Sequence, residues 1–161
     1  MSILFSGSEL LEVALGIEKN GAAFYQALAD KTKHKDAKAI YDYLAGEEKK
    51  HLNTFQSMLD SVGKYQPPES YPGEYMLYLQ SLVDSTVFTD LAAAQRKAEK
   101  TSSEIDALDI GVQAEKDSIL FYAEMQNFVG EADRKVINDI IGEEKSHLWQ
   151  LSELKQIVQK S

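Results

Sequence analysis

The feature that most constrains this 161-residue sequence is a pattern that occurs twice, in which a Glu-x-x-His motif interrupts a stripe of apolar residues. The first copy contains Glu48 and His51, and the second contains Glu144 and His147. Around each motif, apolar residues recur at alternating steps of three and four, which is the spacing of one face of an α-helix. The pattern predicts two long helices that each present a glutamate and a histidine to an apolar interior.

A second pair of segments completes the repeat. Residues 17–25 align with residues 114–122, and each segment carries one glutamate on an apolar helical stripe, Glu18 in the first and Glu115 in the second. The same polar residues therefore occur at matching places in both halves of the chain. Two halves of this kind predict two helical hairpins related by a pseudo-twofold axis, at which equivalent residues can meet.

We expect the hairpins at about residues 8–62 and 103–159, with the third long helix running from about Ser103 to Val129. Between them, at about 63–102, Pro67 and Pro68 are incompatible with one continuous helix. This stretch is too short to form a domain, so we expect it to cross along the bundle as a long connection with shorter helices. The predicted fold class is all-α, a four-helix bundle with one long crossover between the second and third helices, forming a single domain over residues 1–161.

Composition excludes several classes of function. The chain has no cysteine, which excludes disulfides, thiolate metal sites, iron–sulfur clusters and cysteine nucleophiles. Its net charge of −9 argues against nucleic acid as a partner, because few cationic side chains are available to displace counterions. No apolar run approaches the roughly 20 residues of a membrane span, and the first residues do not resemble a signal peptide. We therefore expect no membrane partner and a cytoplasmic location.

The four glutamates and two histidines are predicted to lie together in the apolar core, at about mid-helix height. A buried carboxylate must be paired, protonated or bound to a metal ion. No lysine or arginine lies on these stripes to pair with the carboxylates. Two divalent cations would balance the negative charge of the four carboxylates. The alternative is a bundle in which these glutamates and histidines pair with one another or face solvent.

The predicted arrangement is that of a dinuclear carboxylate site: one glutamate from each of two helices, and Glu-x-x-His from each of the other two. We expect Glu48 and Glu144 to bridge the metals, Glu18 and Glu115 to be terminal ligands, and each histidine to bind one metal. The spacing of three residues puts glutamate and histidine on one helix face. Oxygen-rich sites with some imidazole suit iron or manganese, and zinc is a further alternative.

At these residues the sequence resembles the ferritin-like di-iron carboxylate proteins, and most closely their rubrerythrin-like branch, over about residues 8–158. The resemblance implies a ferritin-like bundle that binds two iron ions and oxidises Fe(II) with hydrogen peroxide or dioxygen. Tyr25 and Tyr122, each seven residues after a predicted ligand glutamate, look like the family's tyrosines that hold a carboxylate in place. The alternatives are a non-catalytic iron-binding or iron-storage protein and a bundle that metals only stabilise.

The chain departs from its relatives in three places. Full rubrerythrins carry a cysteine-ligated rubredoxin domain, so a chain without cysteine is expected to use a separate electron-donor protein. Rubrerythrins have a further glutamate three residues after the third-helix ligand, where this chain has Ser118, and the matching residue of the first half is Gly21. Lys49 stands where bacterioferritins have a haem-binding methionine, so no haem is expected. The family often pairs its bundles, which implies a homodimer.

Two further pairs of residues lie beside the motifs. Glu47 and Glu143 precede the predicted bridging glutamates, and we expect a solvated helix face there, with contacts to the ligands or an iron entry path as the alternative. Gly46 and Gly142 carry a helix cost of about 1 kcal/mol each. Close approach of helices, room near the metals, or chance would account for them.

Overall fold

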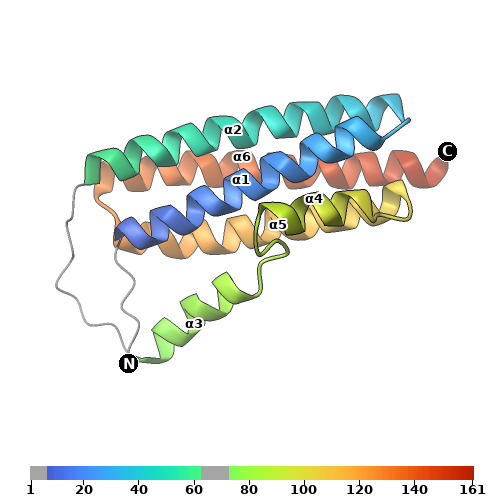
Figure 1. Ribbon diagram of the computed structural model, residues 1–161. Helices are drawn as coiled ribbons and strands as arrows, with labels where there is room; N and C mark the ends of the chain where they lie inside the picture. The colour runs from blue at the N-terminus through green and yellow to red at the C-terminus, as the bar shows by residue number, and fades with distance from the viewer. Residues whose placement is uncertain (1–6, 63–72) are drawn as a thin grey trace.

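The structure, a computed structural model, describes residues 7–62 and 73–161. Its four long helices are α1 (Gly7–Lys31), α2 (Lys35–Val62), α5 (Glu104–Met125) and α6 (Glu131–Lys160). They lie along one another in an elongated bundle (Figure 1), in which α1 pairs with α2 and α5 pairs with α6. The two hairpins meet where α1 contacts α5 and α2 contacts α6. The predicted all-α four-helix bundle is confirmed.

The connection between the hairpins contains two shorter helices, α3 (Gly73–Asp84) and α4 (Leu91–Glu99). The prolines that predicted the break, Pro67 and Pro68, lie outside the described residues. Helix α4 packs along α1, while α3 contacts α5 (Figure 1). Lys31, at the end of α1, donates hydrogen bonds to the carbonyls of Ala98 and Glu99 at the end of α4. A lysine there satisfies carbonyls that have no partner within their helix and fixes the crossover to the bundle.

The third long helix ends earlier than predicted. We expected it to continue to about Val129, but α5 ends at Met125 and a 3₁₀ turn, η1 (Gln126–Phe128), follows it. The tighter turn brings Phe128 into the apolar core, while Val129 has extended backbone. Gly130 then caps the start of α6. A short 3₁₀ turn of this kind is frequent at the end of an α-helix, and local spacing does not distinguish it from a further α-helical turn.

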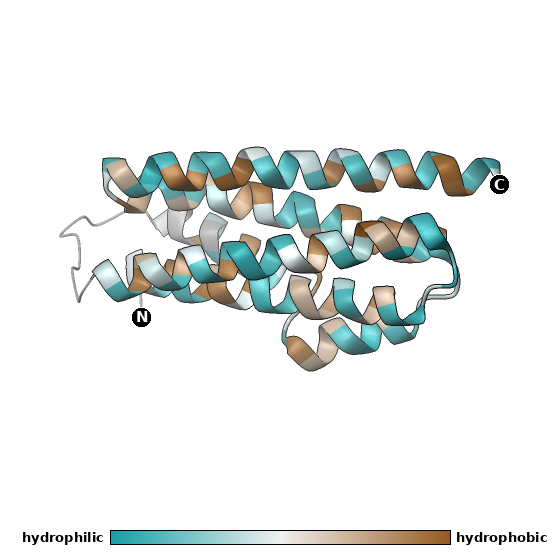
Figure 2. Cartoon of the chain, turned by 90° about the horizontal axis from the view of Figure 1, so that it is seen from above, coloured by the Kyte–Doolittle hydropathy of each residue, from teal (hydrophilic) through white to brown (hydrophobic). Residues whose placement is uncertain are grey.

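Polar and apolar patches alternate along the long helices (Figure 2), and the apolar faces turn inward to form two separate clusters. Each cluster takes buried side chains from all four long helices: Leu10, Phe55, Phe121 and Ile137 in one, and Phe24, Tyr41, Leu108 and Leu151 in the other. On every long helix the predicted metal ligands fall between the residues of the two clusters. The bundle therefore encloses a polar layer between two apolar ones.

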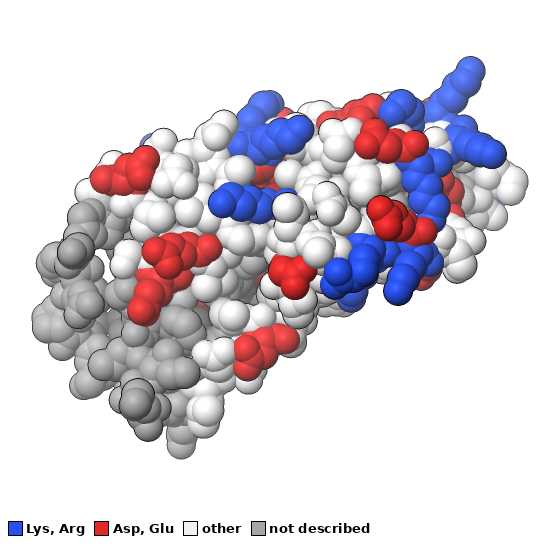
Figure 3. Space-filling model, in the orientation of Figure 1, with Lys and Arg blue, Asp and Glu red and all other residues white. Residues whose placement is uncertain are grey.

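Most charged side chains lie on the outside of the bundle. On the face shown in Figure 3, lysines and arginines gather toward the end that carries the α1–α2 turn and the C-terminus. Within the described part of the chain, no helix combines the length and apolar character needed to cross a membrane. The four glutamates of the polar layer are exceptions, because they are charged-type residues buried inside the bundle.

Candidate metal centre

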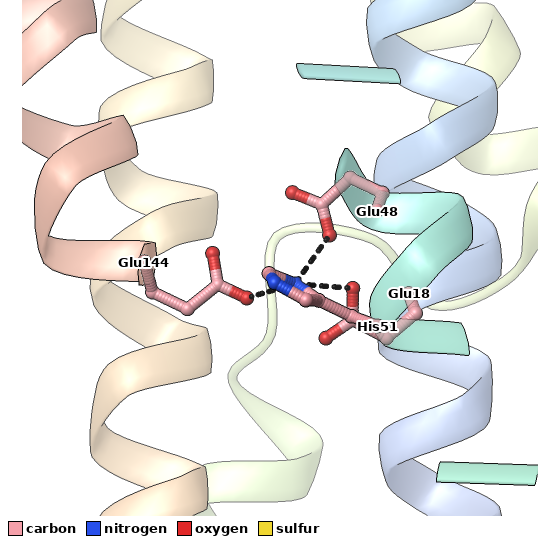
Figure 4. A group of neighbouring side chains, drawn as sticks. All are labelled: Glu18, Glu48, His51 and Glu144. Atoms are coloured by element: carbon pink, nitrogen blue, oxygen red, sulfur yellow. Dashed lines mark ion pairs between the residues drawn. The ribbon is translucent and has the colours of Figure 1, made fainter. Parts of the chain in front are cut away.

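The six predicted ligands lie together in this layer and are at most 4% exposed. We call them the metal centre; it comprises Glu18 on α1, Glu48 and His51 on α2, Glu115 on α5, and Glu144 and His147 on α6. Figure 4 shows how four of these side chains, from α1, α2 and α6, converge on one point. Each histidine follows its glutamate by about one helical turn, which puts both side chains on the same inward face.

Among the described residues, the metal centre divides into two overlapping groups of four. One contains Glu18 and His51, the other contains Glu115 and His147, and both contain Glu48 and Glu144. Within each group the candidate ligand atoms all lie within 4.8 Å of one another. Two carboxylates shared between two groups are the geometry expected of bridging ligands between two ions.

The shared carboxylates divide their oxygens between the two groups. Glu144 Oε1 lies 3.1 Å from His51 Nδ1, and Glu144 Oε2 lies 3.1 Å from His147 Nδ1. Glu48 Oε2 lies 4.0 Å from His51 Nδ1, and Glu48 Oε1 lies 4.0 Å from His147 Nδ1. The two imidazole rings stack with their centroids 5.6 Å apart. Each group therefore has one Nδ1 atom and one oxygen from each shared carboxylate.

Two tyrosines hold the terminal carboxylates from the opposite hairpin. The hydroxyl of Tyr25 on α1 donates to Glu115 Oε1 on α5, at 2.5 Å, and the hydroxyl of Tyr122 on α5 donates to Glu18 Oε1 on α1. Burial raises the pKa of both phenols well above 10, so they remain protonated donors. With Oε1 held in this way, the second oxygen of each terminal carboxylate faces the centre: Glu18 Oε2 lies 3.6 Å from His51 Nδ1, and Glu115 Oε2 lies 3.8 Å from His147 Nδ1.

Several inward-facing atoms of the metal centre have no hydrogen-bond partner. In the described part of the chain these buried orphans are Glu18 Oε2, His51 Nδ1, Glu115 Oε2 and Glu144 Oε1. His51 Nδ1 and Glu144 Oε1 are close in distance but do not have hydrogen-bonding directions. An unsatisfied buried polar group costs about 1–3 kcal/mol. Metal ions would satisfy all of these atoms, and oxygen and imidazole donors fit iron, manganese or zinc.

The carboxyl groups of an ion-free centre resist ionisation. Burial raises the pKa of Glu18 and Glu48 well above the ordinary value of 4.5. Burial and the nearby charge of Glu144 raise the pKa of Glu115 to about 8. These three groups therefore hold their protons more tightly than exposed carboxyl groups do, and metal binding has to displace those protons.

The remaining carboxylate behaves differently because both histidines face it. Burial raises the pKa of Glu144, but the facing imidazoles of His147 and His51 outweigh burial and lower that pKa below its ordinary value. Burial lowers the pKa of His51, but the facing carboxylate of Glu144 outweighs burial and raises that pKa to about 9. The pKa of His147 is likewise lowered by burial but raised by Glu115 and Glu144, to about 10. The ion-free centre therefore stores several protons that metal binding has to release.

For one of the two glutamates that precede the bridging ligands, the alternative interpretation holds. We expected Glu143 on a solvated helix face, and its side chain is 53% exposed, but its Oε2 lies 2.6 Å from His51 Nε2. A carboxylate only accepts, so Nε2 donates and Nδ1 stays available for a metal ion. The matching residue of the other half, Glu47, instead accepts a hydrogen bond from Lys50, at 2.5 Å. An acidic residue on a polar face carries no periodic signal that would have separated these two cases.

The structure excludes one of the explanations considered for the glycines beside the motifs. Among the described residues, a Cβ atom added to Gly46 or Gly142 would meet no atom within 4 Å outside its own helical turn, so close helix approach does not explain them. A Cβ atom on Gly21 would lie 3.3 Å from Glu48 Cδ, and one on Gly111 would lie 3.4 Å from the Tyr25 hydroxyl. The glycines that make room for the centre are therefore on α1 and α5, the helices without the Glu-x-x-His motif.

Comparison with known proteins agrees with this geometry. The Rubrerythrin family model matches residues 9–155. A crystal structure from Thermotoga maritima, named for a ferritin-like diiron-carboxylate protein, is similar to this chain with a TM-score of 0.71 and 28% identity, over 94% of this chain and 95% of that one. A hypothetical protein from Pyrococcus furiosus is similar with a TM-score of 0.71 and 25% identity, over 97% of this chain and 92% of that one.

No curated protein matches the chain significantly. The family match nevertheless spans all four long helices and every residue of the metal centre. The similar solved structures extend over nearly the whole fold. The chain therefore belongs to the rubrerythrin family.

Proposed function

We propose that the protein is a di-iron carboxylate oxidoreductase that binds two iron ions in the metal centre and oxidises Fe(II) with hydrogen peroxide or dioxygen. One observation carries the proposal: two groups of buried ligand atoms share Glu48 and Glu144 and leave inward-facing atoms without partners. Four carboxylates balance the charge of two divalent cations. Iron is the metal that combines this donor set with ready one-electron chemistry.

Bound iron would supply the redox chemistry, since two Fe(II) ions give up one electron each and one hydrogen peroxide with two protons becomes two water molecules. The chain supplies the surroundings. Tyr25 and Tyr122 orient the terminal carboxylates, and Glu143 orients His51. The two apolar clusters exclude bulk water on either side of the polar layer. Because the chain has no cysteine, we assign the return of electrons to a separate donor protein.

The test begins with anaerobic Fe(II) titration of the metal-free protein, followed by rapid mixing with peroxide or with dioxygen. We expect two irons per chain, oxidation by at least one of the two oxidants, and repeated turnover when a reductant is supplied. A single oxidation that cannot be repeated with a competent reductant would contradict the proposed catalytic activity. The protein would then be an iron-binding protein without turnover.

The ligand assignment is tested by the double variant Glu48→Gln and Glu144→Gln, which keeps side-chain volume but removes both shared charges. We expect iron loading to be lost. The control is Glu12→Gln with Glu153→Gln, because these glutamates are exposed on α1 and α6. Unchanged iron content in the first variant would rule out the metal centre.

A further inference from the structure

A small cavity lies against the metal centre, between α1, α5 and the segment that joins α3 to α4. Glu48 and Glu115 form its inner wall, and neither histidine lines it. Gly21 and Ser118 lie beside these carboxylates and keep the space open. The Ser118 hydroxyl turns back to donate to the Ala114 carbonyl, at 3.1 Å, and so does not fill the cavity.

The cavity shares part of its lining with a groove on the surface. An open groove of about 420 Å³ runs between α1 and residues 83–89. Gly16 gives it width, because no described atom outside its own helical turn lies within 4 Å of the place of a Cβ. Ile17, Asn20, Thr86 and Phe88 line both the groove and the cavity. These four shared residues, which we call the neck, lie between the groove and the cavity, so that groove, neck and cavity outline a path from the surface toward the inner carboxylates, which we call the route.

The segment over the route is fixed in place. The backbone N–H of Val87 donates to Asp117 Oδ2, at 3.0 Å, which ties the segment to α5. The buried ring of Phe88 packs on Phe24 of α1 with the ring centroids 4.7 Å apart. The Thr86 hydroxyl donates within the segment to the carbonyl of Val83. Contacts with both α1 and α5 therefore fix the position of the neck.

The route fits a small neutral molecule better than a cation. The room in the cavity is about 20 Å³, which holds about one water-sized molecule, so a divalent cation with its hydration shell does not fit. Much of the lining is uncharged, as with Ile17, Val87 and Ala114. The carboxylate of Asp117 is already occupied, because Oδ2 accepts from Val87 and Oδ1 accepts from Gln113.

The geometry points to an oxidant entry site: the cavity between Gly21 and Ser118 admits one molecule of a small neutral oxidant, dioxygen or hydrogen peroxide, to the Glu48–Glu115 side of the metal centre. The reaction of the oxidant at the centre rests on the proposed function, whereas its entry into the cavity does not. Neither His51 nor Glu143 lines the cavity, so the oxidant enters away from their contact.

The test fills the cavity with Ser118→Leu. The matched control is Ser152→Leu, because the Ser152 hydroxyl makes the same kind of bond, to the Leu148 carbonyl at 2.8 Å, on an exposed face of α6. A second filling variant, Ala114→Val, adds less volume and keeps the experiment decisive if Ser118→Leu does not fold.

Entry is measured first without metal, as the paramagnetic relaxation that dissolved dioxygen causes at the methyl groups of Val87 and Ala114 by NMR. We expect strong relaxation in the wild type, compared with the buried methyl group of Ala14, and its loss at Val87 in the filled variants. Equal, weak relaxation at the cavity and core methyl groups of the wild type would overturn the entry site.

The second measurement uses iron-loaded protein. We expect the filled variants to bind iron with unchanged stoichiometry but to be oxidised by peroxide about tenfold more slowly, equivalent to about 1.4 kcal/mol in the barrier. The control should keep the wild-type rate. Wild-type oxidation rates in a folded, filled variant would also overturn the entry site. If the wild type binds no iron, the proposed function fails, and the dioxygen measurement still decides the entry site.

Discussion

At the scale of single residues, the two halves of the metal centre are unequal. His51 has a carboxylate partner behind it, Glu143, whereas the matching Glu47 pairs with Lys50. The ring of His147 instead meets Tyr43 edge-on, with centroids 6.2 Å apart. A carboxylate behind a ligating imidazole fixes its orientation and increases its basicity. The ion bound beside His51 should therefore be held more tightly than the ion beside His147.

The Glu143→Ala substitution tests this difference. We expect one of the two stepwise iron affinities to fall by about 10- to 100-fold, the range found when such outer partners are removed. Competition with a chromophoric chelator under anaerobic conditions measures both steps. Glu47→Ala is the control and should leave both affinities unchanged. Equal effects of the two substitutions would show that the contact between Glu143 and His51 does not act on the metal.

At the scale of the helices, the glycines have two different environments. Gly21 of α1 faces the Glu48 carboxyl, so an alanine there would push against a predicted bridging ligand. Gly46 of α2 and Gly142 of α6 face open space, although they are the glycines nearest to the motifs in sequence. Glycine loses more conformational freedom than alanine when the helix forms, which lowers helix stability. In the described structure no packing contact at these two glycines offsets that loss.

Alanine substitutions distinguish these environments. Gly46→Ala and Gly142→Ala should each raise the free energy of unfolding by about 0.5–1 kcal/mol, as measured by denaturant titration, with unchanged iron binding. Gly21→Ala should weaken iron binding, because a Cβ 3.3 Å from Glu48 Cδ displaces that carboxyl group. Wild-type iron affinity in Gly21→Ala would show that the carboxyl group has room to move.

At the scale of the whole molecule, the metal centre couples stability to pH. Without ions, the folded pKa of Glu115 is about 8, above its ordinary value of 4.5, and those of Glu18 and Glu48 are also raised. Between these values the folded chain binds more protons than the unfolded chain, so the free energy of unfolding falls as pH rises. The raised pKa values of His51 and His147, about 9 and 10, act in the same direction at higher pH.

Metal binding releases these protons, so the metal affinity rises with pH. The stability of metal-bound protein relative to metal-free protein should therefore increase with pH. We expect the gap in Tm between protein loaded with redox-stable Mn(II) and metal-free protein to widen from about pH 5.5 to about pH 8.5. Thermal unfolding of both forms in the same buffers checks this. The rest of the chain is common to both forms. A difference in Tm that stays constant or narrows as pH rises would therefore contradict the release of protons on metal binding.

The sequence alone predicted the four long helices and the six residues that meet between them. Both predictions depend on spacing within a helix, and the position of a side chain around a helix follows from 3.6 residues per turn whatever packs against it. The repeat added the symmetry, and with it the sharing of Glu48 and Glu144 between two groups. Whether these residues bind iron stays a prediction that the metal titration decides.

The tertiary structure decided what depends on neighbours from another element. Tyr25 follows Glu18 by two turns, yet it bonds Glu115 across the bundle, and Glu143 rather than Glu47 reaches a histidine. The cavity beside Ser118 exists because residues 83–89 lie over the gap between α1 and α5. Spacing along a helix gives the direction in which a side chain points, but only the packing of separate segments determines what it meets there.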